Sequence, residues 1–133
     1  MKRKKPKLTP VEWEVMEAVW AIGGAPSVRD VLERAYPRGE KAYTTVQTVM
    51  NTLERKGLLR RKKTGLVNFY EPARSRRDLE RDETASMIRR VFGGSPAAMA
   101  SALLSLDGLG REEIDEIKRL VARKERELGE EGS

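Results

Sequence analysis

Residues 42–72 decide the fold of this chain and read AYTTVQTVMNTLERKGLLRRKKTGLVNFYEP. In the first half, apolar side chains recur at i, i+3, i+4 and i+7, the spacing of one helix face: Val46, Val49, Met50 and Leu53. Gly57 predicts the end of that helix, and residues 58–70 have the pattern of a strand, a tight turn at Gly65 and a second strand. The stretch therefore predicts a helix over 42–56 that leads directly into a β-hairpin.

The opposite face of the predicted helix carries short or planar hydrogen-bonding side chains, and no charged residue occurs between Ala42 and Leu53. An ordinary solvated helix face more often carries Glu and Lys. Uncharged polar side chains can reach base edges in the major groove of DNA, and Gln or Asn can pair bidentately with adenine. We therefore predict base or base-adjacent contacts for four residues: Thr44, Gln47, Thr48 and Asn51.

Four consecutive cations precede the Gly65 turn, where they can contact phosphates. Together with neighbouring polar and basic residues they form the predicted phosphate-contacting set: Thr45, Arg55, Lys56, Arg60, Arg61, Lys62 and Lys63. Two alternatives remain open within this set. Thr45 can instead cap the helix, and Arg60 or Arg61 must point inward or sideways if the strand alternates.

Two further helices are predicted before this stretch. Thr9 is a candidate N-cap with Pro10 at the first helical position, and Ser27 with Asp30 has the form of a capping box. A short strand at 25–27 can pair with the hairpin. Three helices followed by a two-stranded wing give the order of a winged helix-turn-helix, in which the third helix is the reading element.

The composition changes at residues 71–75, and Ser75 with Asp78 predicts a new helix, followed by a small-residue helix over 97–106 and a last helix to about Leu128. The last helix keeps coiled-coil spacing for only about two heptads. Three such helices cannot bury their apolar stripes alone, so we predict pairing with a second copy. The alternative is a monomeric three-helix subdomain folded onto the winged domain. The predicted dimerisation residues are Met87, Ile88, Val91, Phe92, Met99, Leu103, Ile114, Ile117, Leu120 and Val121.

These patterns predict a mainly α fold with a small β wing. The predicted parts are a basic disordered arm over 1–7, a winged-helix DNA-binding domain over 8–74, a helical dimerisation domain over 75–128 and a disordered tail over 129–133. Residues 1–75 hold 16 Lys and Arg against 8 Asp and Glu, whereas residues 76–133 hold 11 against 13. A cationic excess confined to the first part is expected of a nucleic-acid-binding domain joined to a domain with another task.

The composition also excludes several function classes. The chain has no Cys, which rules out disulfides, thiolate metal ligands and cysteine nucleophiles, and no His, the commonest general base and metal ligand. We therefore expect neither an enzyme nor a bound cofactor or metal. The basic start is followed by no apolar segment, and no apolar run of about 18 residues occurs. This predicts a cytoplasmic protein without direct membrane insertion.

Five motifs extend across the chain: LTPVEWEVM at 8–16, YTTVQTV at 43–49, LERKG at 53–57, NFY at 68–70 and FGG at 92–94. With these motifs the chain resembles the penicillinase-repressor family of winged-helix transcriptional regulators (BlaI/MecI type), from Leu8 to about Leu128. The resemblance implies a homodimeric repressor on a palindromic operator. The winged domain of each subunit would read one half-site, and the helical tails would form the dimer.

The resemblance also implies relief of repression by cleavage inside the dimerisation region, linked to a membrane-embedded sensor metallopeptidase. The equivalent bond falls near Ala102 and Leu103. The antibiotic-resistance repressors that are cleaved look to have Asn-Phe at that bond. This chain has Ala102-Leu103 at the equivalent place and so departs from their pattern. Copper-responsive relatives carry a cysteine-rich C-terminal motif, and the lack of Cys argues against that metal-sensing branch.

Two other functions are compatible with a winged helix. A protein-interaction module would favour exposed aromatic or aliphatic side chains on the third helix, where this chain has Thr, Gln and Asn. A non-specific DNA or RNA binder would not distinguish an inverted repeat from random duplex. A comparison of binding to those two kinds of DNA separates these readings.

Overall fold

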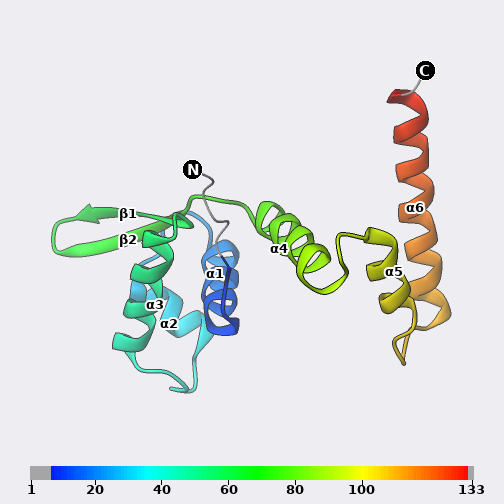
Figure 1. Cartoon of the computed structure of the whole chain (residues 1–133). Helices are drawn as coiled ribbons and strands as arrows, with labels where there is room; N and C mark the ends of the chain where they lie inside the picture. The colour runs from blue at the N-terminus through cyan, green and yellow to red at the C-terminus, as the bar shows by residue number, and fades with distance from the viewer. Residues whose placement is uncertain (1–6, 132–133) are drawn as a thin grey trace. The chain divides into compact units, whose positions relative to one another are not determined.

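The computed structural model describes residues 7–131 (Figure 1). Over these residues the elements follow in the order α1 (Pro10–Ile22), α2 (Val28–Ala35), α3 (Tyr43–Arg55), β1 (Leu59–Thr64), β2 (Val67–Pro72), α4 (Arg76–Val91), α5 (Pro96–Leu104) and α6 (Arg111–Glu131). β1 and β2 form an antiparallel hairpin, the wing, in which Leu59 pairs with Pro72 and Thr64 with Val67. The order from α1 to β2 confirms the predicted winged helix-turn-helix.

α1 begins at the predicted N-cap Thr9, which forms a full capping box with Glu12, and α2 begins at the predicted box of Ser27 and Asp30. Thr9 Oγ1 accepts a hydrogen bond from the Glu12 N–H at 3.1 Å, and the Glu12 carboxylate accepts one from the Thr9 N–H at 2.8 Å. Ser27 and Asp30 exchange the same pair of bonds at the start of α2. Each box satisfies donors that have no partner within the helix, so residues three apart in the sequence set where these helices start.

α3 starts at Tyr43, with Ala42 as its N-cap and no side-chain cap. The alternative in which Thr45 caps the helix is therefore wrong. Thr45 lies in the first turn, and its N–H donates to the Ala42 carbonyl at 3.1 Å. After the helix, Gly57 has a φ of 79°, a left-handed conformation that ends helices and favours glycine.

The predicted short strand before α2 is confirmed as a single bridge. Ser27 pairs with Phe69 in the antiparallel sense, and the Tyr70 N–H donates to the Pro26 carbonyl at 2.8 Å. This contact ties the start of α2 to β2. It holds the base of the wing against the helices.

One hydrophobic core joins the first three helices to the wing. Its most deeply buried side chains are Val15, Met16, Val19, Val31, Val46, Met50, Leu53, Leu58, Leu59, Tyr70 and Leu79. The predicted inward face of α3 is confirmed, with Val49 partly buried against the core. Because this face packs inward, the polar residues on the other side of α3 lie at the surface.

Leu79 in α4 is only 1% exposed and extends the core past residue 74, where the sequence predicted the domain boundary. Nearby, Trp20 Nε1–H donates to the Arg74 carbonyl at 3.0 Å, and the Arg74 guanidinium pairs with Asp82 at 2.6 Å. The chain divides into two compact units between Ser86 and Met87. The first turns of α4 therefore belong to the winged unit, and the helical unit begins at Met87.

The described part of the helical unit contains no buried residue in α5 or α6. α5 starts at the predicted cap, where Ser95 Oγ accepts from the Ala98 N–H at 3.0 Å. α6 continues to Glu131, so the predicted disorder is wrong for residues 129–131. Gly129 costs a helix only about 1 kcal/mol relative to Ala, which is too little to end α6.

The predicted basic arm lies outside the described residues except for Lys7, and residues 132–133 also lie outside them. The Lys7 carbonyl accepts a hydrogen bond from the Lys56 ammonium at 2.9 Å. Between residues 7 and 131, no helix is both long and apolar enough to span a bilayer.

Candidate nucleic-acid interface

The predicted base-contacting residues share the outer face of α3. Thr44 and Thr48 are exposed, and Gln47 and Asn51 are half-buried. Among the described residues, the side chains of Thr44 and Gln47 have no hydrogen-bond partner. Their donors and acceptors therefore remain free to bind a ligand along this face.

Asn51 differs from the other three residues because its amide has a partner inside the protein. The Tyr70 hydroxyl donates to Asn51 Oδ1 at 2.7 Å, and Tyr70 is only 1% exposed. Burial raises the pKa of Tyr70, while the charge of Arg61 and a side-chain hydrogen bond from it oppose that rise. The wing thus orients one side chain of the α3 surface.

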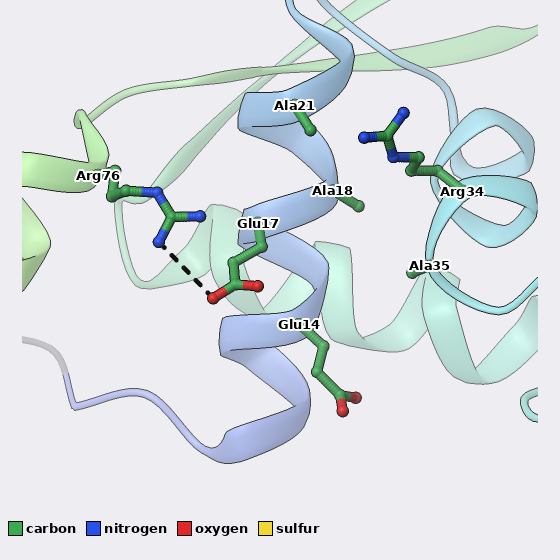
Figure 2. Close-up of a pocket in the computed structure, with 7 residues that line it drawn as sticks. All are labelled: Glu14, Glu17, Ala18, Ala21, Arg34, Ala35 and Arg76. Atoms are coloured by element: carbon green, nitrogen blue, oxygen red, sulfur yellow. Dashed lines mark ion pairs between the residues drawn. The ribbon is translucent and has the colours of Figure 1, made fainter.

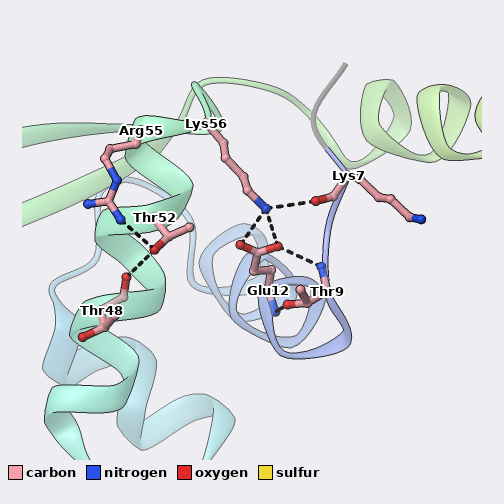
Figure 3. A network of polar contacts seen from close by, with 7 residues as sticks. All are labelled: Lys7, Thr9, Glu12, Thr48, Thr52, Arg55 and Lys56. Carbon is pink, nitrogen blue, oxygen red and sulfur yellow. Dashed lines mark hydrogen bonds and ion pairs between the residues drawn. The ribbon is translucent and has the colours of Figure 1, made fainter. Parts of the chain in front are cut away.

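The basic residues at the end of α3 have different surroundings (Figure 3). Arg55 is exposed, and its Nη2 donates to Thr52 Oγ1 at 3.1 Å, which in turn donates to the Thr48 carbonyl at 3.0 Å. Lys56 instead points toward α1 and pairs with the Glu12 carboxylate oxygens at 2.8 and 2.9 Å. Arg55 is therefore open to a phosphate, whereas Lys56 is committed to Glu12 within the protein.

Glu12 is the only charged residue that is buried among the described residues, at 5% exposure. Burial by itself raises the pKa of this carboxyl, but hydrogen bonds from Lys56 and from Thr9 outweigh it and leave the pKa below its ordinary value. The same Lys56 ammonium also donates to the Lys7 carbonyl. Lys56 thus fastens the end of α3 to the start of α1 (Figure 3).

The wing cations alternate between two faces of β1. Arg60 and Lys62 pair with Glu71 across the hairpin at 3.1 and 3.2 Å, and they hold the pKa of Glu71 below its ordinary value. Arg61 lies on the other face and pairs with Glu54 of α3 at 3.4 Å. Arg60 and Arg61 therefore point to opposite faces of β1, as the alternation of a strand requires.

All four cations of the run 60–63 are exposed. Exposed ion pairs contribute only about 0–1 kcal/mol, so a phosphate can replace a carboxylate partner at little cost. Among the described residues, Lys63 has no acidic partner at all. The wing therefore offers a cationic edge beside the polar face of α3.

The predicted dimerisation residues lie at or near the surface of the helical unit. Met87, Val91, Leu103, Leu120 and Val121 are exposed, the last two at 52% and 55%. The remaining members of the set are half-buried: Ile88, Phe92, Met99, Ile114 and Ile117. The predicted cleavage position lies within α5, where Ala102 is half-buried and Leu103 is exposed.

A separate hollow of about 360 Å³ lies among α1, α2 and the start of α4 (Figure 2). Its charged lining residues are Glu14, Glu17, Arg34 and Arg76, and Arg76 pairs with Glu17 at 3.7 Å. Burial and the Glu14 carboxylate, which accepts the Tyr36 hydroxyl, raise the pKa of Tyr36 well above its ordinary value. The hollow shares no residue with the polar face of α3 or with the wing.

Sequence reasoning missed the partners that orient the interface. Nothing in the pattern linked Glu12 to Lys56 or Tyr70 to Asn51, because the members of each pair are 44 and 19 residues apart. It also missed Arg29, whose guanidinium lies 5.5 Å from the Tyr43 ring and adds a cation near the start of α3. The only local signal was the N-cap candidate Thr9 at the start of the first helix, and it gave no indication that Glu12 has an ion partner.

Known proteins with similar sequences include repressors and regulatory proteins. A family model described as penicillinase repressor matches residues 8–123. The penicillinase repressor of Bacillus licheniformis is 27% identical over 119 residues, which cover 90% of this chain and 92% of that protein. The methicillin resistance regulatory protein MecI of Staphylococcus aureus (strain N315) is 23% identical over 124 residues, 93% of this chain and 100% of that protein.

One similar solved structure is the solution structure of the Bacillus licheniformis BlaI monomeric form in complex with the blaP half-operator. It has 28% sequence identity and a TM-score of 0.47, and the match covers 56% of this chain and 90% of that one. The family model, by contrast, spans the whole winged helix-turn-helix and continues through α4 and α5 into α6. On that match, this chain belongs to the penicillinase repressor family.

Proposed function

We propose that this protein represses transcription as a homodimer on a palindromic operator, with α3 of each subunit in the major groove of one half-site. Membership of the family makes the protein a DNA-binding transcriptional repressor. The observation that carries the proposed binding mode is the outer face of α3, which is uncharged from Thr44 to Asn51 and lies beside a cationic wing. Uncharged donors and acceptors suit base edges, and cations suit phosphates.

The contacts divide into two classes. Base or base-adjacent contacts are assigned to Thr44, Gln47, Thr48 and Asn51, which share the exposed side of α3. Phosphate contacts are assigned to Thr45, Arg55, Arg60, Arg61, Lys62 and Lys63. Lys56 leaves the phosphate set, because its ammonium already binds Glu12 and the Lys7 carbonyl.

Exposed apolar side chains support the dimer. Leu120, Val121 and Leu128 on α6 are each more than half exposed within a single chain. Burial of apolar surface against a second copy contributes about 25 cal/mol per Å². A two-fold dimer would then align two α3 helices with half-sites whose centres lie about 34–36 Å apart, one turn of the duplex.

Release of the operator by proteolysis is a further part of the proposal. The equivalent bond near Ala102 and Leu103 lies within α5, so that turn must unwind before a protease can bind it in extended form. Co-expression with a membrane metallopeptidase from the same genome, followed by mass spectrometry of the repressor, tests this step. Fragments ending near Ala102 support it, and an intact chain under inducing conditions contradicts it.

Selection of bound duplexes from a random DNA pool tests the proposed function. We expect enrichment of an inverted repeat, together with sedimentation of the free protein as a dimer at micromolar concentration. A monomer that enriches no symmetric sequence would contradict the proposal. Equal binding to the repeat and to random duplex would instead favour the non-specific binder.

A further inference from the structure

The start of α4 is fastened to the winged core by contacts of three kinds. Trp20 Nε1–H of α1 donates to the Arg74 carbonyl at 3.0 Å, and the side chain of Leu79 is buried in the core at 1% exposure. The Arg74 guanidinium pairs with Asp82 at 2.6 Å. These four residues, Trp20, Arg74, Leu79 and Asp82, are called the α1–α4 clamp below. All of them lie within the winged unit.

Two further contacts surround the clamp. The Ala73 N–H donates to the Leu58 carbonyl at 2.9 Å, which ties the segment before α4 to the residues that follow α3. The Arg76 guanidinium lies 5.1 Å from the Trp20 ring and pairs with Glu17 of α1 at 3.7 Å (Figure 2). Arg76 and Glu17 are exposed, so their ion pair is weak and the clamp carries most of the constraint on α4.

α4 connects the two compact units of the chain without a break. It is one helix over Arg76–Val91 and crosses the division between the units after Ser86. At its far end the N–H groups of Phe92 and Gly94 both donate to the Ile88 carbonyl, at 3.1 and 2.9 Å, so the turn that follows is bonded back to the helix. A tilt at the start of α4 is therefore passed on to its end.

The length of α4 makes a small tilt large at its far end. The part of the helix beyond Leu79 extends about 18 Å at about 1.5 Å per residue. A tilt of about 11° at Leu79 therefore shifts Val91 by about 3.4 Å, which is the rise of one base pair. In a two-fold dimer both subunits make the same shift. The separation of the two α3 helices then depends closely on the direction of α4.

We propose that the α1–α4 clamp fixes the direction of α4 on the winged unit and thereby makes the repressor selective for one separation of its two half-sites. This inference rests on the proposed function, because it requires a dimer that binds both halves of a palindromic operator. Trp20 and Arg74 are then positioning residues that act through α4. A loosened clamp leaves each α3 able to bind its half-site and lets the second winged unit reach half-sites at other separations.

Gel-shift titrations of the full chain on a series of duplexes test the inference. The duplexes carry the selected inverted repeat at its selected separation or with the half-sites one or two base pairs closer or farther apart, and a further duplex carries a single half-site. We expect wild-type binding to weaken at least about tenfold when the separation changes by one base pair, because both half-sites are then not engaged together. The single half-site measures one winged unit alone.

Trp20→Phe removes the Nε1–H that binds the Arg74 carbonyl and keeps an aromatic ring. The penalty for a change of one base pair should fall below about threefold, while affinity for the single half-site stays within about twofold of wild type. Trp13→Phe is the matched control, because Trp13 is also in α1, is partly buried against the same core and has its ring 6.0 Å from that of Trp20. This variant should keep the wild-type penalty.

Arg74→Met keeps the inference testable if thermal unfolding shows that Trp20→Phe does not fold. It retains the backbone carbonyl and removes the guanidinium that pairs with Asp82, so the penalty should again fall below about threefold. Arg77→Met is its control. It removes an exposed guanidinium from the first turn of α4, outside the clamp, and should keep the wild-type penalty.

Three results overturn the inference while the proposed function stands. The first is a wild type that enriches an inverted repeat but binds all separations equally. The second is a folded Trp20→Phe or Arg74→Met variant that keeps the wild-type penalty, with or without a loss of half-site affinity, since the clamp would then only stabilise the core. The third is an equal fall of the penalty in the control variants. Failure of the wild type to enrich any inverted repeat overturns both the inference and the proposed function.

Discussion

At the scale of single residues, Gln47 and Lys62 represent the two kinds of proposed DNA contact, to bases and to phosphates. Gln47 lies half-buried on the uncharged face of α3, so Gln47→Ala should cost about 1–3 kcal/mol on the operator and leave binding to random duplex nearly unchanged. Lys62 is exposed on the wing, and Lys62→Ala should weaken binding to both DNAs and lower the salt slope by about one. Gel-shift titrations at two salt concentrations measure both effects. Equal losses on both DNAs for Gln47→Ala would rule out direct readout by that residue.

A substitution of Lys56 tests the stability of the fold and not a contact with DNA. Lys56→Met leaves the Glu12 carboxylate buried without its ion partner, and we expect a loss of about 2 kcal/mol in the free energy of unfolding. The value is smaller than the 3–5 kcal/mol of a fully buried pair because the Lys56 side chain is 30% exposed. Urea denaturation at neutral pH measures it. Lys63→Met, the same change at an exposed wing cation, should stay within about 0.5 kcal/mol of wild type.

The pH dependence of stability follows from the same ion pair. The pKa of Glu12 in the folded protein lies below its ordinary 4.5, so the folded state favours the charged carboxylate. The stabilisation is present above pH 4.5 and is lost as the pH falls through the lower folded-state pKa. In Lys56→Met this acid-induced loss should shrink, because the hydrogen bond and the charge of Lys56, which lower the pKa of the carboxyl, are then absent. Denaturation curves at about pH 5 and about pH 3 measure the difference; an equal acid-induced loss in both proteins would contradict the assignment.

At the scale of elements, the start of α4 is part of the winged unit. Leu79→Ala should cost about 2–5 kcal/mol, the usual effect of a deleted leucine side chain in a core, because Leu79 is 1% exposed. A fragment that ends after Arg74 should be less stable than one that ends after Ser86 by a similar amount. Urea denaturation of the two fragments measures this difference. Equal stabilities would show that α4 contributes nothing to the winged core.

At the scale of the whole molecule, the exposed apolar side chains of α6 predict how the protein associates. Val121→Lys places a charge within the proposed dimer contact and should shift sedimentation at micromolar concentration toward the monomer. Glu116→Lys introduces the same exposed side chain on another side of α6 and should leave the dimer intact. Dissociation by both variants, or by neither, would argue against a contact centred on Val121.

The winged unit by itself should bind DNA less tightly than the dimer. A fragment ending after Ser86 should fold as a monomer and bind a half-site, while its affinity for the full operator should fall about 100-fold or more. In the dimer, the second winged unit binds its half-site at a high effective concentration because it is linked to the first, and the monomeric fragment lacks this link. Sedimentation and gel shifts on full and half operators measure this. A fragment that is itself a stable dimer would contradict the assignment of dimerisation to the helical unit.

Much of the architecture was predictable because its causes are local. The caps at Thr9 and Ser27 join residues three apart in the sequence. Gly57 directly follows the C-cap residue of α3. The apolar period of α3 places Val46, Met50 and Leu53 in the core. Each of these signals acts within about one or two turns of chain, so the sequence alone determined the element order and the polar face of α3. It did not determine where α6 ends, because one glycine costs a long helix little.

Only the tertiary structure decided which charged and polar groups meet. Lys56 was indistinguishable in sequence from the cations of the wing, yet packing of α3 against α1 turned it onto Glu12. The same packing joined Tyr70 to Asn51 and brought Leu79 into the core past the apparent boundary. Such pairings depend on distances through space between segments that are far apart in the chain. A pattern of residue types carries no information about those distances until the core has formed.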